Sequence, residues 1–335
     1  MSWKDLFKSK AARGKPDPRL RWFGKLPTYA DYYSSSGDEE WALEFNEWVL
    51  KGYEVYVARQ REGRSAARLS AAGALRLPKS QMTVFASFQD YGGDMRGRPF
   101  PLCFYVGLPT ALWPGPTSGR AATALRLLAE LTRLRDQVFR FFNAPGRFEA
   151  VFGGQELDLA GLDDESDDAS WVQTARTLSF ADWFAAAREC LKVEDAGAWC
   201  QQAAAWGASI AKLEGEEFGP TLRFPLVMNM PFDVQVAGWT RWLEQRVDLK
   251  RRLLSLIISH DPGAATGRLT VIARDLMPED FLLATPLAAS LPYLDDLCGL
   301  RPAATEGSMA GDAPAQQALR VPEHWWDFVE DAAPA

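Results

Sequence analysis

Apolar residues recur along the chain with two different periods, and these periods predict where strands and helices lie. Short apolar runs bounded by Gly, Pro or charged residues predict strands over 21–26, 82–88, 100–108, 222–230, 253–259 and 268–274. Apolar residues at helical spacing predict helices over 38–60, 117–142, 180–191 and 195–212, another around 239–247, and a short one opening at Pro278. Single strands, hairpins and helices follow one another without strict βα alternation. This order predicts an α+β fold with helices flanking a largely antiparallel sheet.

Polar residues predict where three of these helices begin. Ser36 and Glu39 have the spacing of a capping box ahead of the first helix. Thr117-Ser118 and Ser179 stand at the starts of two later helices, where a side-chain oxygen accepts a hydrogen bond from a free backbone N–H.

The two ends of the chain differ in composition from its middle. Residues 1–20 are basic and polar, and residues 301–320 have the composition of a disordered linker. An acidic tail, residues 321–335, follows and carries Trp325, Trp326 and Phe328. Exposed aromatic clusters mark contacts, so this tail either packs back on the domain or is a linear motif that docks on a partner.

Size and charge exclude several classes of protein. The chain has 335 residues, of which 47% are hydrophobic, which is ample for a large core. Its formal net charge of −7 argues against a general nucleic-acid-binding protein, because such proteins need a basic surface. The N-terminus lacks the apolar segment of a secretory signal, and no run approaches the roughly 18 apolar residues of a membrane-spanning helix. These features predict a cytoplasmic protein without a membrane span.

Residues that carry metal or redox chemistry are sparse and scattered. The four cysteines, Cys103, Cys190, Cys200 and Cys298, form no CxxC pair, and the chain has two histidines, His260 and His324. Zinc sites use closely spaced Cys and His pairs, so the sequence predicts no metal site and buried free thiols instead.

Known catalytic motifs are absent as well. Gly24-Lys25 is followed by Leu26-Pro27 and not by the Ser or Thr of a phosphate-binding loop. His260 precedes Asp-Pro-Gly in a predicted turn, and no GxSxG motif is present. We therefore expect no catalytic residue, no cofactor and no small-molecule substrate.

Two short motifs nevertheless form a recognisable pair. The first runs from Trp22 through Gly24, Lys25, Leu26 and Pro27 to Asp31, and is followed by a helix that carries Trp48. The second comprises Asp94, Gly97, Arg98, Phe100 and Pro101 in the order D-x-x-G-R-x-F-P-L. In order and spacing the pair resembles the TagF/ImpM family of accessory proteins of type VI secretion. The resemblance is best over 21–145 and thinner over 222–300, and residues 150–300 are expected to complete the domain.

The resemblance implies a single domain over 21–300 with an α/β/α sandwich similar to longin or roadblock modules. It also implies a cytoplasmic posttranslational regulator, generally a repressor of apparatus assembly, that binds the forkhead-associated scaffold protein of the secretion system. Fold alone does not establish function, so two alternatives stay open. One is a longin-like adaptor for a GTPase or a membrane assembly, and the other is an enzyme of undetected class.

We interpret the motif residues themselves as mainly structural. Asp94 and Arg98 carry opposite charges in one loop, and Arg98 is also suited to bind a phosphate or a carboxylate. If the two motifs are neighbours in space, Asp31 and Arg98 are expected to form an ion pair. Charged atoms more than about 6 Å apart would contradict this hypothesis.

Overall fold

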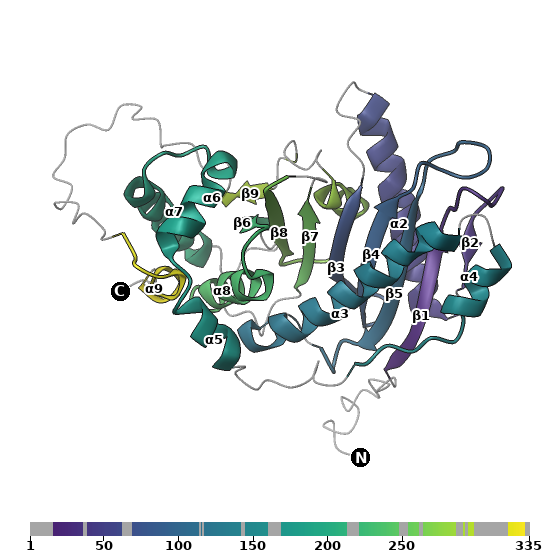
Figure 1. The fold of residues 1–335 in the computed structure, drawn as a ribbon, viewed down its shortest axis with the longest axis horizontal. Coiled ribbons are helices and arrows are strands. Elements are labelled where there is room, and N and C mark those ends of the chain that lie inside the picture. The colour runs from purple at the N-terminus through teal and green to yellow at the C-terminus, as the bar shows by residue number, and fades with distance from the viewer. Residues whose placement is uncertain are drawn as a thin grey trace, which may run out of the picture.

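The structure is a computed structural model that describes residues 16–35, 39–61, 69–113, 115, 117–141, 145–159, 169–212, 221–247, 254–260, 264–285, 291, 294–297 and 321–331. Within these residues, nine strands form one sheet in the order β2-β1-β5-β4-β3-β7-β8-β6-β9 (Figure 1). The strands are β1 (Asp17–Gly24), β2 (Tyr33–Ser34), β3 (Ser70–Leu77), β4 (Met82–Asp90), β5 (Pro101–Pro109), β6 (Thr221–Val227), β7 (Ser255–His260), β8 (Thr266–Ile272) and β9 (Leu294–Asp296).

Strand pairing joins the two halves of the chain. The strands pair antiparallel, except that β9 lies parallel to β6. β3 pairs with β7, so strands from before residue 110 and strands from after residue 220 belong to one continuous sheet. The predicted α+β class and the predicted antiparallel sheet are therefore confirmed.

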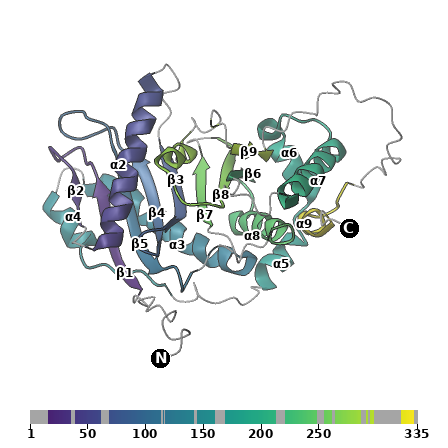
Figure 2. The same cartoon turned by 180° about the vertical axis from the view of Figure 1, so that it is seen from behind.

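Helices cover both faces of the sheet. On one face lie α3 (Ser118–Asp136) and α8 (Phe232–Glu244) (Figure 1), and on the other lies α2 (Glu40–Arg61) (Figure 2), which packs against the 3-10 helix η3 (Pro278–Ala284). The remaining helices are η1 (Gln137–Phe141), α4 (Pro145–Phe152), α5 (Ala169–Ala175), α6 (Phe180–Leu191), α7 (Ala196–Lys212) and α9 (Trp325–Asp331).

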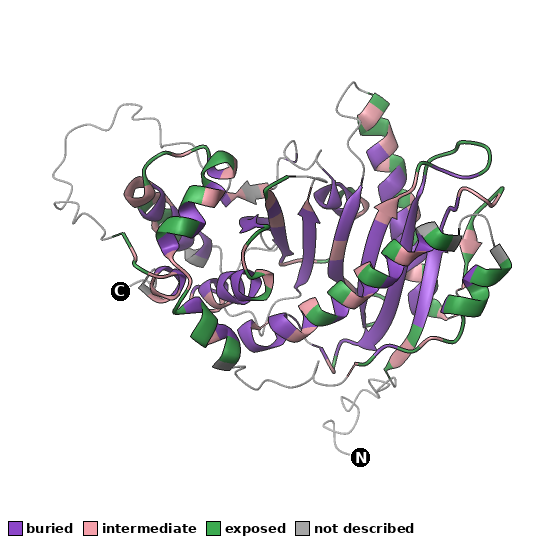
Figure 3. Ribbon diagram, viewed as in Figure 1, coloured by how far each residue is buried: buried purple, intermediate pink, exposed green. Residues whose placement is uncertain are grey.

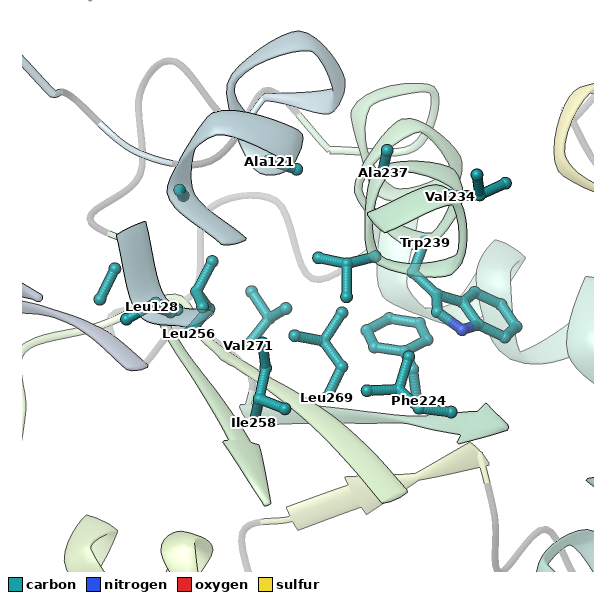
Figure 4. Close-up of a cluster of buried hydrophobic side chains, with 14 of the residues drawn as sticks. Ala121, Leu128, Phe224, Val234, Ala237, Trp239, Leu256, Ile258, Leu269 and Val271 are labelled. Atoms are coloured by element: carbon teal, nitrogen blue, oxygen red, sulfur yellow. The ribbon is translucent and has the colours of Figure 1, made fainter. Parts of the chain in front are cut away.

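Each face of the sheet has its own core because neighbouring residues of a strand point to opposite faces. On β1, Trp22 belongs to the core beneath α3, whereas Phe23 belongs to the core beneath α2. Buried residues accordingly fill the sheet and the inner sides of the helices (Figure 3). Beneath α8, Phe224 of β6, Leu269 and Val271 of β8 and the ring of Trp239 pack together (Figure 4).

Most of the helices and strands predicted from the apolar periods occur in the structure, which also contains several elements that were not predicted. Thr117 and Ser179 cap α3 and α6 as predicted, by accepting hydrogen bonds from the N–H groups of Arg120 and Asp182. Ser36 lies outside the described residues, as does the predicted linker 301–320. β2, β3, β9, α4 and α5 were not predicted.

Several predicted boundaries are wrong. The helix predicted around 239–247 is α8, which begins at Phe232, and the strand predicted over 222–230 is β6, which ends at Val227. β1 begins at Asp17, so the basic N-terminal segment is shorter than residues 1–20. Regular α-helix ends at Asp136 and continues as the tighter η1, so the predicted helix over 117–142 is two elements.

The outer edge of β1 is covered by segments that lie far from it in sequence. Leu20 donates its N–H to the carbonyl of Gln155, and Leu157 donates to the carbonyl of Pro18. Ser35, just after β2, donates to the carbonyl of Trp22. These hydrogen bonds satisfy backbone groups of an edge strand that could otherwise pair with a strand of another chain. It also fixes the loop 25–32, which leaves the end of β1.

Candidate functional site

The two sequence motifs meet at the end of β1, and we call residues 24–33 together with residues 91–101 the motif junction. Gly24 pairs with Leu102 of β5 and has φ +149°. A Cβ atom on Gly24 would lie 2.1 Å from the carbonyl oxygen of Pro101. Glycine is required here because both the backbone conformation and the close approach of the neighbouring strand exclude a side chain.

The carboxylate of Asp94 lies at the centre of the motif junction, and its side chain is fully buried. One oxygen accepts hydrogen bonds from the backbone N–H groups of Arg96 at 2.9 Å and Arg98 at 3.0 Å. The other accepts from the Arg98 guanidinium at 2.8 Å and lies 3.4 Å from Nζ of Lys25. Lys25 of the first motif and Arg98 of the second therefore share one anion.

Burial and hydrogen bonding have opposite effects on the Asp94 carboxyl. Burial alone would raise its pKa, because a charge is less stable away from water. The hydrogen bonds from the N–H groups and guanidinium of Arg98 and from the N–H of Arg96, with the charge of Lys25, outweigh burial and hold the pKa well below its ordinary value. Asp94 is thus ionised at neutral pH and fixes the loop that carries Arg96 and Arg98.

Arg98 also contacts the loop of the first motif. Its guanidinium donates to the carbonyl oxygen of Ala30 and lies 4.0 Å from the carboxylate of Asp31. Met95 donates its N–H to the carbonyl of Tyr29 at 2.9 Å. The Asp31–Arg98 distance lies inside the limit set from the sequence, but Asp31 is 76% exposed and Asp94 is the principal partner of Arg98.

The other motif residues support these loops or the core beneath them. Phe100 is buried against Phe23, Tyr32 and Tyr53, at centroid distances of 5.7, 4.9 and 4.9 Å. Trp48 of α2 donates its indole N–H to the carbonyl of Met277 at 2.9 Å, far from the junction in sequence. The remaining members are Leu26, which is buried in the core, Pro27, which is half-buried, Gly97 with φ +69°, and Pro101, which begins β5.

The outer surface of the motif junction carries two exposed apolar side chains. Met95 is 66% exposed and Tyr32 is 45% exposed. The ring of Tyr32 stacks on Phe23 with an interplanar angle of 8°, and the Lys25 ammonium lies 4.8 Å from its centroid. Tyr32 is consequently held in place without a bound partner. The sequence motifs contain both loops but gave no signal that these two side chains face outward.

A concave surface lies over the middle of the sheet, apart from the motif junction. A groove of about 680 Å³ opens between α3, the N-terminus of α8 and strands β3 and β7. Its lining is mainly apolar and includes Leu125, Leu128, Phe232 and Ile258. Charged residues at the groove, such as Arg126 and Arg133, are exposed on α3, where Arg133 pairs with Glu130. Sequence analysis missed this groove because the small residues of β3 had no strand pattern.

The aromatic tail forms α9 and packs on its own chain. Trp325 and Phe328 are buried among the aromatic rings of α6, α7 and α8. Trp326 is half-buried, with its centroid 5.6 Å from Trp171 and the Arg176 guanidinium 5.4 Å from its ring. Of the two alternatives for this tail, the structure shows the first: the tail packs back on its own domain. The docking alternative does not describe Trp325 and Phe328 in this structure, because both rings are buried against their own chain.

Two further features of the described residues concern metal binding and membranes. Among the residues that the structure describes, no three His, Cys, Asp or Glu side chains gather as a metal site. In the same part of the chain, no helix combines the length and the apolar character needed to cross a bilayer.

Comparison with known proteins gives little further information. No family model and no curated protein matches the chain. Among solved structures it is similar to PA0076 from Pseudomonas aeruginosa PAO1, with 18% identity and a TM-score of 0.32. The match covers 42% of this chain and 63% of PA0076, so it spans somewhat less than two thirds of that protein. At this level of similarity it carries no argument about fold or function.

Proposed function

We propose that this chain is a non-enzymatic, cytoplasmic accessory protein of type VI secretion that acts by binding another protein. Its partner in this proposal is the forkhead-associated scaffold of the secretion system, and its effect is posttranslational repression of apparatus assembly. The proposal rests on the resemblance of the two sequence motifs to the TagF/ImpM family.

One observation carries the proposal. The two motifs are about 60 residues apart in sequence, yet Lys25 and Arg98 contact the same buried carboxylate of Asp94. Motifs that arose by chance have no reason to meet at one ion-paired centre. Their meeting supports the view that the pair is a single structural feature, as the family resemblance implies.

The surface of the motif junction is suited to protein recognition. Tyr, Met and Arg are enriched at the centres of protein interfaces, and rigid aromatic side chains lose little entropy on binding. Tyr32, Met95 and Arg98 provide these residue types on loops that Asp94 holds in place. In our proposal the scaffold contacts this surface.

Calorimetric titration of the purified chain with a purified forkhead-associated scaffold protein tests the proposal. We expect a one-to-one complex, weakened at least about tenfold by Met95→Asp, because loss of an interface hot spot costs 2 kcal/mol or more. Met228→Asp is the matched control, since Met228 is also an exposed methionine, at 36%, and follows β6, which lies far from β1 in the strand order of the sheet. Absence of binding, or equal weakening by both variants, would overturn the proposal.

A further inference from the structure

The segment that follows residue 320 fills a groove built by residues far earlier in the chain. Residues of α5, α6, α7 and α8 contact α9, and we call the surface that they form beneath it the aromatic groove. Figure 1 shows α9 beside these helices. The centroid of Trp325 is 4.4 Å from Trp183 of α6 and 4.9 Å from Trp239 of α8. Phe328 lies 5.1 Å from Trp199 of α7. The groove therefore surrounds one face of a short helix with aromatic rings.

The groove has a notch for the first of these side chains. A Cβ atom on Gly238 of α8 would lie 2.5 Å from the indole nitrogen of Trp325 and 3.3 Å from a methyl carbon of Val329. Because Gly238 has no side chain, Trp325 and Val329 of α9 can pack directly against the backbone of α8. Anchors at positions 325, 328 and 329 have the i, i+3, i+4 spacing by which an amphipathic helix is recognised in a groove.

Charge is complementary across the rim of the aromatic groove. Arg241 of α8 donates to the carboxylate of Glu330 at 3.0 Å. Arg176, just after α5, lies over the ring of Trp326. α9 has acidic residues at Asp327 and Glu330, so the groove presents cations to an acidic helix.

Groups at the start of α9 are satisfied partly from within the segment and partly by the strand-like segment around Ser179. Asp327 accepts the N–H of His324 at 3.0 Å, which satisfies a group at the start of the helix from within the segment. Backbone contact with the rest of the chain includes two hydrogen bonds, from Trp325 to Leu178 and from Phe180 to Glu323. Residues 298–320, with a predicted linker over 301–320, connect α9 to the preceding strand region. A helix with its own cap and its own connection has the properties of a tethered ligand.

We propose that the aromatic groove is a recognition site for a short acidic amphipathic helix of a partner protein, and that α9 occupies this site in cis. The partner helix carries a Trp or Phe at the position of Trp325, an aromatic three residues later, a branched apolar residue next and then Glu. Tethering supplies α9 at an effective concentration in the millimolar range, so a partner helix competes only when it binds tightly or is itself held nearby. α9 thereby sets the affinity threshold of the site.

The test uses the full-length chain with a protease recognition sequence inserted between residues 310 and 311. Cutting leaves residues 321–335 held by non-covalent contacts alone. A labelled synthetic peptide of residues 321–335 is then added, and fluorescence anisotropy reports its binding to cut and uncut protein. We expect one peptide to bind per cut chain, and binding to the uncut chain to be at least about tenfold weaker because the tethered α9 competes.

Peptide variants show whether the binding follows the pattern of anchors. Trp325→Ala in the peptide should weaken binding by at least about 100-fold, since its ring is fully buried and truncating such an aromatic hot spot removes a large share of the binding energy. Val321→Ala is the matched control and should bind normally, because Val321 is 44% exposed. A peptide of unrelated sequence that keeps only the residues at positions 325, 328, 329 and 330 should bind within about tenfold of the native one, since interface anchors carry most of the binding energy.

Three results would overturn the proposal. The first is a cut chain that stays folded by circular dichroism yet never exchanges its tail for labelled peptide. The second is a cut chain that unfolds when the tail is removed, which would make α9 an integral part of the core. The third is binding that requires the native sequence throughout or that ignores Trp325→Ala. The test contains no secretion component, so its outcome is independent of whether the scaffold binds the motif junction.

Discussion

The motif junction and the aromatic groove each join parts of the chain that are distant in sequence, but different forces hold them. Directional contacts to one buried carboxylate and a close backbone approach at Gly24 hold the motif junction. Packed rings hold α9 in the aromatic groove, where Trp325 lies against Trp183 and Trp239. Directional contacts demand particular residues at particular positions, whereas apolar packing demands mainly volume and shape.

This difference explains how each region is expected to respond to change. Removing a ring from the aromatic groove leaves a cavity, and its cost grows with the volume lost. At the motif junction, the stability lost on substitution depends on backbone geometry and on ionisation, because each substitution changes either a backbone conformation or a charge. Four variants separate these behaviours.

Trp325→Ala should have the largest effect. Truncation of a fully buried Trp costs about 3–5 kcal/mol in free energy of unfolding, measured by urea denaturation. Trp326→Ala is the control within the same helix and should cost less, because Trp326 is only half-buried. If α9 detaches as a unit, the cost of Trp325→Ala cannot exceed the docking free energy of α9. A second alanine at Phe328 would then add little, which contrasts with the additive loss expected for an integral core.

Gly24→Ala should be the next most damaging change. The new Cβ would overlap the carbonyl oxygen of Pro101 at φ +149°, so we expect a loss of about 3 kcal/mol from backbone strain and overpacking together. Gly97→Ala is a matched control in the second motif, with φ +69° and no atom within 4 Å of the added Cβ. It should lose only about 1 kcal/mol, from the left-handed conformation alone. Equal losses for the two variants would show that close approach is not the reason for Gly24.

Asp94→Asn tests the ionic character of the motif junction. The pKa of Asp94 is held below its ordinary value, so its ionised form contributes stability above the unfolded-state pKa of about 3.9. That contribution is lost as pH falls through the lower pKa of the folded state. The variant should therefore melt at lower temperature than the native chain at neutral pH, and the gap should narrow as pH falls below about 4. Melting curves from pH 7 to pH 2 check this, and a gap independent of pH would contradict it.

Sequence periodicity located the long elements, because α2, α6 and the β4–β5 and β7–β8 hairpins carry clear apolar patterns and turns. It missed β3, whose Ser-Ala-Ala-Gly-Ala run lacks the branched and aromatic residues typical of strands. β3 is a strand because it lies between β4 and β7 and both edges find partners. Tertiary pairing, and not local preference, determines this element.

The two candidate sites also differ in how much of each could be predicted from the sequence. The motif junction was foreseen in part, since the spacing of the second motif pointed to an Asp94–Arg98 pair. The contact of Lys25 with Asp94 was not foreseen, because nothing in either motif says which cation reaches the carboxylate. For the tail, composition left both packing and docking open. Only the positions of Trp183, Trp199 and Trp239 decide between them, and those rings come from three separate helices.

Asp31→Asn should have the smallest effect and defines where the motif junction ends. Asp31 and Arg98 are 4.0 Å apart and both are substantially exposed, so water screens their attraction. Exposed ion pairs of this kind contribute about 0–1 kcal/mol. Asn keeps an oxygen that can accept the N–H of Tyr32, as Asp31 does at 2.9 Å, so the substitution removes the charge alone. We expect a loss below about 0.5 kcal/mol in urea denaturation, further reduced by added salt. A loss near that of Asp94→Asn would mean that the ionic network extends to the exposed tip of the loop, and the surface around Tyr32 would then depend on both carboxylates.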